Sequence, residues 1–149
     1  MARKQLPDDF KEFIQCLNKH RVRYLLVGGW AVGIYGNPRA TKDIDFLIAT
    51  DDANIEQLQR ALYEFGAPIV ENKVFQEPGN VYRMGSSPIQ IDIINQASGI
   101  DFESSYARRE ILSSDEVDIS MISRADLIRN KKASGRHRDL ADVEFLEGD

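Results

Sequence analysis

The chain has 149 residues, of which 42% are hydrophobic and 29% are charged, a balance typical of a folded domain with a core of its own. Its formal net charge of -5 argues against a dedicated duplex nucleic-acid binder, which would present a basic face. The single cysteine excludes an internal disulfide framework, no run of about 18 apolar residues exists to span a membrane, and the start lacks the apolar core of a signal peptide. We therefore expect a cytoplasmic protein with a single domain over residues 1–149.

The first third of the chain predicts helices and strands in alternation. Apolar residues at helical spacing after Pro7 indicate an amphipathic helix, and RYLLV indicates a buried strand that ends at two glycines. The elements expected here are a helix after Pro7, a strand over 23–27, a short helix over 30–35, a strand over 43–49 and a helix over 55–65.

The rest of the chain predicts shorter elements. We expect strands over 72–76 and 81–84 joined by a hairpin turn, a strand over 89–94, a loop with one helical turn over 97–116, an edge strand over 117–122, a helix from a capping box at 123–126 towards 132, and a last helix over 139–146. This order indicates an α/β (α+β) fold, with a mixed, largely antiparallel sheet and helices packed on it. The catalytic core would span about 7–95 and a C-terminal helical segment about 123–147.

Asp43 and Asp45 lie within the predicted strand over 43–49, where apolar residues would be the ordinary choice. Residues two apart on a strand point to the same face, so both carboxylates project together, about 7 Å apart along the strand. Carboxylates this close repel each other, and partial burial strengthens the repulsion. The pair is either the solvent face of an antiparallel strand or part of a site for a divalent cation.

A third carboxylate is available in IQIDII, residues 89–94. Gln90 and Asp92 share one face of that strand, and isoleucines form the other. If this strand pairs beside residues 43–49, Asp92 completes a group of three carboxylates. Such a group suits two Mg²⁺ ions that clamp a phosphoryl or nucleotidyl group during its transfer.

Gly28 and Gly29 end a buried strand and begin a helix. Because glycines carry no side chain, their backbone amides are open to a phosphate, which the partial positive charge of a helix N-terminus favours. The segment matches neither the GxGxxG dinucleotide fingerprint nor the GxxxxGK[ST] phosphate loop. A tight strand-to-helix turn without a ligand is the alternative.

Together, Val27-Gly28-Gly29, Asp43-Ile44-Asp45 and Asp92 resemble the nucleotidyltransferase superfamily related to DNA polymerase beta. That family has a hydrophobic residue, Gly, and Gly or Ser at the end of one strand, Asp-x-Asp on the next, and a third Asp on a later strand. The form Gly-Gly-x-Ala-Val followed by Arg-x-Thr-x-Asp-x-Asp is similar to bacterial antibiotic nucleotidyltransferases and to toxin-type transferases of abortive-infection systems. The likeness is strongest over residues 25–48 and weaker beyond Asp92.

The resemblance implies a role for each matched residue. Asp43, Asp45 and Asp92 would be the catalytic residues and the Mg²⁺ ligands, and Asp92 would also help to deprotonate the acceptor. Gly28 and Gly29 would hold the phosphates of a nucleoside triphosphate through their backbone amides.

Four further residues are expected at the phosphates. Arg39 and Thr41 belong to the family signature, and we expect them near phosphate or bracing the loop. Related transferases also have a Lys followed by Arg-x-x-Asp near the C-terminus, so Lys131 or Lys132 would contact phosphate, with Asp139 positioning it by a salt bridge. A basic helix end that complements the helix dipole explains these lysines equally well.

Three more residues lie next to these motifs. Trp30 has apolar neighbours, so we expect a buried anchor rather than a contact with a base. Tyr82 and Arg83 precede Asp92 on a strand and are candidates to line the acceptor side of the cleft.

We predict a Mg²⁺-dependent nucleotidyltransferase that moves an NMP from an NTP to a hydroxyl or phosphate acceptor and releases pyrophosphate. The alternative is a nucleotide-binding regulatory or toxin–antitoxin module without catalysis of its own, and a metal-dependent nuclease or phosphatase ranks third. The preferred NTP is left open, as is the acceptor, whether a small molecule, a protein or tRNA. Because little of the chain remains to build an acceptor domain, a homodimer is one way to complete the cleft.

Overall fold

A computed structural model of the chain describes residues 6–36, 43–86, 89–114 and 116–148. The helices are α1 (Asp8–Lys19), α2 (Gly28–Ile34), α3 (Asp52–Phe65), α4 (Lys73–Gln76), α5 (Phe102–Ala107), α6 (Arg124–Ser134) and α7 (His137–Glu147). The strands are β1 (Tyr24–Val27), β2 (Asp43–Ile48), β3 (Val81–Ser86), β4 (Ile89–Ile94), β5 (Glu110–Ser114) and β6 (Val117–Met121).

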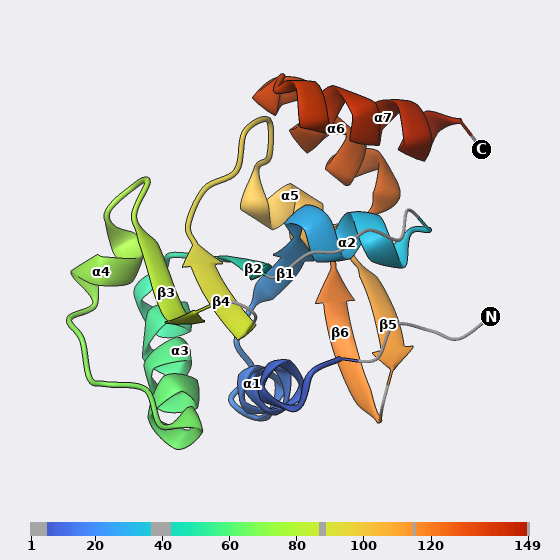
Figure 1. Cartoon of the computed structure of the whole chain (residues 1–149). Helices are drawn as coiled ribbons and strands as arrows, with labels where there is room; N and C mark the ends of the chain where they lie inside the picture. The colour runs from blue at the N-terminus through green and yellow to red at the C-terminus, as the bar shows by residue number, and fades with distance from the viewer. Residues whose placement is uncertain (1–5, 37–42, 87–88, 115, 149) are drawn as a thin grey trace.

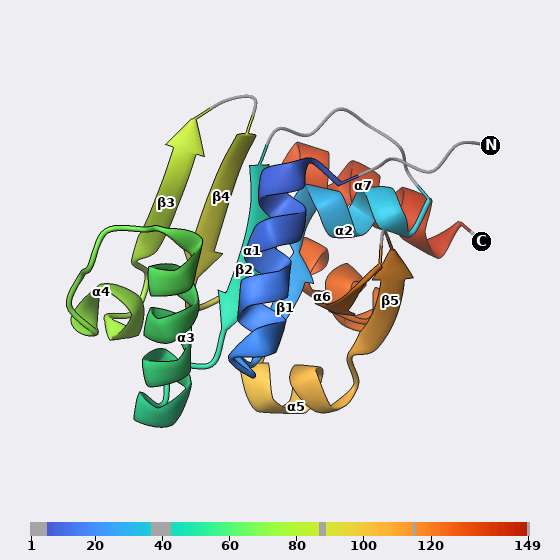
Figure 2. The same cartoon turned by 90° about the horizontal axis from the view of Figure 1, so that it is seen from below.

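The six strands form one mixed sheet in the order β3-β4-β2-β1-β6-β5. Neighbours in the chain pair antiparallel (β1 with β2, β3 with β4, β5 with β6), whereas β2 pairs parallel to β4 and β1 parallel to β6. Helices α1 and α3 cover one face of the sheet and the α6–α7 pair lies on the other side, while α2 follows β1 and contacts both α1 and α6 (Figures 1 and 2). The predicted mixed sheet with helices packed on it is confirmed.

Aromatic contacts join the helices to the sheet. Phe13 of α1 packs edge to face on Phe46 of β2 and on Phe65 of α3, with ring centroids 5.3 and 5.1 Å apart. Trp30 of α2 packs in the same way on Phe10 of α1, at 5.6 Å, and is buried as expected for an anchor. Such aromatic pairs stabilise a fold beyond the area that they bury.

The ends of the longer helices follow local chemistry. The Asp51 side chain caps α3 by accepting from the Asn54 amide, and Gly66 ends that helix in the left-handed conformation. Ser123 caps α6 in the predicted way, because its hydroxyl accepts from the Asp126 amide at 3.1 Å. No helix in the described ranges is long and apolar enough to cross a membrane.

Three predictions for the middle of the chain were wrong. Residues 73–76 form the single turn α4 rather than a strand, because Phe75 turns into the core and packs on Tyr82. The hairpin therefore forms between β3 and β4. The segment over 97–116 contains the expected helical turn as α5 but also the strand β5, and β5 rather than the predicted strand over 117–122, which forms as β6, takes the edge of the sheet.

Candidate active site

Two neighbouring parallel strands bring the three predicted carboxylates to one face of the sheet. In the register of β2 and β4, Asp45 lies beside Asp92 and Asp43 lies beside Gln90. The residue between the two β2 aspartates, Ile44, is fully buried on the opposite face. The strand pairing that would complete the carboxylate group is thus present, and it follows from alternation along β2 and β4.

The carboxylates of this cluster repel one another. The pKa of Asp45 is raised from 3.8 to about 6, first by burial and then by the charges of Asp92 and Asp43. The positive charges of Lys131 and Arg83 act in the opposite direction, so both cations lie within electrostatic reach of Asp45. A group of acids that raises the pKa of its own member is a favourable place for a cation.

Gly28 makes room for Asp45 at the end of β1. A Cβ at this position would lie 2.3 Å from Oδ2 of Asp45, and the backbone has a φ of +72°, which favours glycine. Gly29 follows, half-buried, in the first turn of α2, where Val27 as N-cap offers no side-chain hydrogen bond. Glycine is therefore required at position 28 by the close approach of the carboxylate.

Asp92 is held by an arginine of the neighbouring strand. Nε of Arg83 donates to Oδ1 of Asp92 at 2.9 Å, and the Nη2 group of Arg83 donates to Oδ2 at 3.3 Å. The Asp92 side chain is 8% exposed and the Arg83 side chain 58%. The contact comes from the β3–β4 register, in which the two residues are direct partners.

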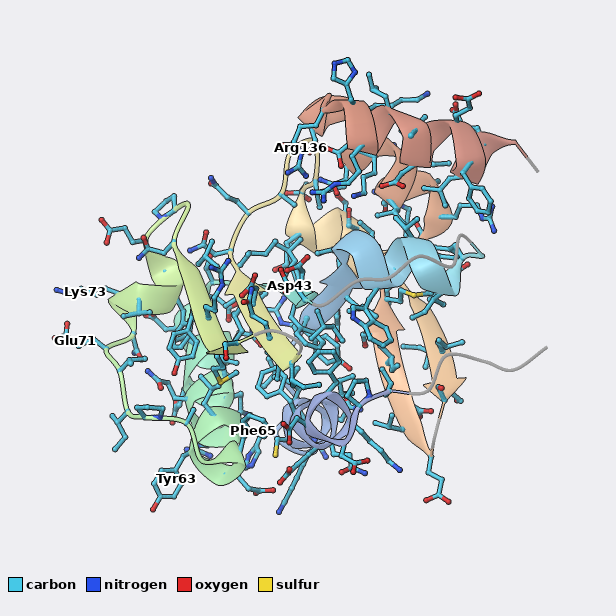
Figure 3. The ribbon with its side chains drawn as sticks, viewed as in Figure 1. Asp43, Tyr63, Phe65, Glu71, Lys73 and Arg136 are labelled. Atoms are coloured by element: carbon cyan, nitrogen blue, oxygen red, sulfur yellow. The ribbon has the colours of Figure 1, made fainter. Side chains whose placement is uncertain are left out.

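Lys131 forms a buried ion cluster between α6 and α7. Its Nζ lies 3.1 Å from Oδ1 of Asp139 and 3.4 Å from Oδ2 of Asp142, and all three side chains are nearly inaccessible. Burial alone would raise the pKa of Asp139, but hydrogen bonds from Arg136 and Lys131 bring it below its usual value. Arg136 lies at the α6–α7 junction, above Asp43 in the view of Figure 3.

The other phosphate-site candidates are placed as follows. Lys132 is exposed and pairs with Glu147 at 2.8 Å. The expected positions of Arg39 and Thr41 lie outside the described residues.

The carboxylates have the donor chemistry that a divalent cation requires. Oxygen ligands from a few carboxylates suit Mg²⁺, and a bound cation would offset the burial and the repulsion from Asp92 and Asp43 that raise the pKa of Asp45. Within the described ranges, no group of three or more His, Cys, Asp or Glu side chains is arranged so that it could hold a metal ion. Asp92 faces Arg83 instead, so a cation that used all three acids would require Asp92 to exchange its partner.

Sequence analysis missed two contacts of this region. It left Asp142 without a role, although the i+3 spacing from Asp139 places both on one face of a helix. It placed Arg83 near the cleft but did not pair it with Asp92, because that pairing depends on the register of two strands.

A family model described as nucleotidyltransferases of unknown function (DUF6036) matches residues 4–146. No curated protein matches the chain in sequence.

Solved structures share the fold over most of the chain. The lincosamide antibiotic adenylyltransferase LnuA, solved with lincomycin bound, aligns with a TM-score of 0.63 and 15% identity, over 97% of this chain and 98% of that one. The antibiotic-resistance factor ANT(2″)-Ia aligns with a TM-score of 0.60 and 12% identity, over 93% of this chain and 80% of that one. An antigenic nucleotidyltransferase-like protein from Paracoccidioides brasiliensis gives 0.55 and 17%, over 96% and 78%. At these identities the likeness shows a shared fold.

Proposed function

The chain belongs to the family of nucleotidyltransferases of unknown function (DUF6036), and from this we propose that it transfers an NMP from a Mg²⁺-bound NTP to a hydroxyl or phosphate acceptor. The observation that carries the proposal is the set of three carboxylates on β2 and β4, packed against a glycine pair at the end of β1. This is the place where the family motif and the geometry agree.

In the proposed reaction, an oxygen of the acceptor forms a bond to the α-phosphorus of the NTP, and the bond from that phosphorus to the bridging oxygen breaks. Pyrophosphate leaves, and the acceptor proton would pass to a carboxylate, a role that the family resemblance implies for Asp92. Bound Mg²⁺ would neutralise the triphosphate and stabilise the charge that develops on the leaving group. Asp43, Asp45 and Asp92 would hold it, and the orientation of the reactants by the protein would supply much of the acceleration.

Two further groups support binding of the triphosphate. Gly28, which lies directly against the Asp45 carboxylate, and Gly29 stand in the first turn of α2, where the backbone amides of a helix N-terminus favour a phosphate. Lys131 is the better supported of the two lysines, because its charge reaches Asp45 while Asp139 and Asp142 fix its position. Lys132 instead pairs with Glu147.

Lincomycin is bound in the structure of LnuA, which shares the fold over 97% of this chain. We therefore place hydroxyl-bearing small molecules first among the acceptors to test, followed by tRNA and protein, including the chain itself.

The proposal is tested with each of the four NTPs labelled at the α-phosphate, incubated with Mg²⁺ and these acceptors. We expect label on one acceptor together with release of pyrophosphate, and loss of both in Asp43→Asn. The matched control is Asp9→Asn, which removes an exposed carboxylate from the first turn of α1. Release of orthophosphate without labelled acceptor would instead identify a phosphatase, and pyrophosphate release that Asp43→Asn leaves unchanged would contradict the proposed site.

A further inference from the structure

Arg83 lies on β3, the edge strand next to β4, and its guanidinium faces the acid cluster. Its two hydrogen bonds to Asp92, at 2.9 and 3.3 Å, form the two-point contact that a guanidinium makes with a carboxylate. The pKa of Arg83 is raised, first by the hydrogen bond to Asp92 and, among smaller causes, by the charges of Asp43 and Asp45. The geometry thus makes Arg83 the direct counter-ion of Asp92.

Both oxygens of Asp92 are occupied by these donors. Nε2 of Gln90 lies 3.4 Å from each of them, in addition to the two contacts from Arg83. The Asp92 side chain is otherwise almost inaccessible. A cation cannot approach these oxygens on the side that the guanidinium covers, so ligation by Asp92 and the ion pair with Arg83 compete.

The two partners differ in how easily they can move. Asp92 is fixed on a strand between β2 and β3, whereas more than half of the Arg83 side chain is in solvent, at 58% exposure. Arg83 can thus leave the contact by changing its side-chain rotamers while the sheet stays in place.

We propose that Arg83 is a positioning residue: it pairs with Asp92 in the metal-free protein and dissociates from Asp92 when a divalent cation binds to this carboxylate. The inference rests on the proposed function, because it takes Asp92 as a ligand. It goes beyond it by assigning to Arg83 the control of cation affinity at this carboxylate: the cation binds more weakly than the three acids alone would allow.

The first test measures Mn²⁺ binding without nucleotide, by electron paramagnetic resonance of the free ion. The matched control is Arg60→Gln, an exposed arginine paired with Glu56 on α3, on the opposite face of the sheet. We expect Arg83→Gln to tighten Mn²⁺ binding at least about fivefold, and Arg60→Gln to leave it unchanged. Binding by Arg83→Gln that equals or is weaker than that of the natural chain would overturn the proposal.

The second test follows the ion pair itself by NMR. The Nε–H signal of Arg83, assigned by its absence from Arg83→Lys, should move on addition of Mg²⁺ towards its position in Asp92→Asn. A signal that stays in place when Mg²⁺ is saturating would show that Arg83 keeps Asp92, and would overturn the proposal.

Asp45→Asn separates this inference from the proposed function. If Asp45→Asn binds Mn²⁺ as tightly as the natural chain, the proposed metal site fails and the role of Arg83 fails with it. If Asp45→Asn weakens binding but Arg83→Gln does not tighten it, only the role of Arg83 is contradicted.

Discussion

Asp45 shows how one residue can serve a ligand at a cost to the fold. Its carboxylate is partly buried beside two other acids, and its pKa is raised to about 6 by burial and by the charges of Asp92 and Asp43. An asparagine would fit the same strand without that cost. The charge is useful only where a cation offsets it, and this is why the residue argues for a site.

The cost at Asp45 predicts a pH dependence. The folded protein keeps the Asp45 proton up to a pKa of about 6, whereas the unfolded chain loses it near 3.8. Stability from the protonated form is therefore complete below about pH 4 and is lost as the pH rises through about 6. With chelator present, Asp45→Asn should be more stable than the natural chain by about 1–3 kcal/mol at pH 8, and this gain should vanish near pH 4. Urea unfolding across this range measures it, and a gain independent of pH would contradict the account.

At the scale of an element, the first residue of α2, Gly28, is constrained by its contact with the candidate site. The positive φ of Gly28 and its close contact with Asp45 mean that only glycine fits at this position. A Cβ on Gly33 in the same helix, by contrast, would have no heavy atom within 4 Å. Gly28→Ala should therefore destabilise the protein by about 1–3 kcal/mol and weaken nucleotide binding.

Gly33→Ala is the matched control for this change. It should be neutral or stabilise the protein by up to about 1 kcal/mol, because alanine is favoured within a helix. Thermal unfolding of both variants tests the pair. Equal effects would show that the contact between Gly28 and Asp45 carries no special constraint.

The α6–α7 pair depends on a buried charge. Replacing Lys131 by Met removes the buried cation that Asp139 and Asp142 share, although Asp139 keeps Arg136, and should destabilise the protein by about 3–5 kcal/mol. Lys132→Met removes only the exposed pair with Glu147 and should cost no more than about 1 kcal/mol. Chemical denaturation separates the two lysines, and similar losses would contradict the assignment of Lys131 to the buried cluster.

At the scale of the whole molecule, the helices and strands that local sequence patterns determine could be predicted from the sequence. The segments of α1, β1, β2 and α3 have apolar periodicity and clear stops, and they form as expected. The run over 72–76 was predicted wrongly because four or five apolar and polar residues do not distinguish a strand from a helical turn. The β5 segment, EILSS, has no clear alternation, and only its pairing with β6 makes it a strand.

The candidate site likewise contains residues that the sequence could predict and contacts that only the folded structure shows. Gly28, Asp43 and Asp45 are close in sequence, so a motif could bring them together. Alternation along residues 89–94 made Asp92 a candidate on the condition that its strand pairs beside residues 43–49, and its pairing with Arg83 required the β3–β4 register, which turn geometry and tertiary packing determine.

The most direct test of the central claim, that the acid cluster binds a Mg²⁺-bound nucleotide, is thermal unfolding with ATP, GTP, CTP or UTP, each with Mg²⁺ and with chelator. A nucleotide at about 100 times its Kd should stabilise the protein by roughly 2.7 kcal/mol, and the Asp43→Ala, Asp45→Ala variant should lose this gain. The exposed pair Asp8→Ala, Asp9→Ala should keep it. No metal-dependent shift with any of the four nucleotides, or an equal shift in the Asp43→Ala, Asp45→Ala variant, would contradict the claim.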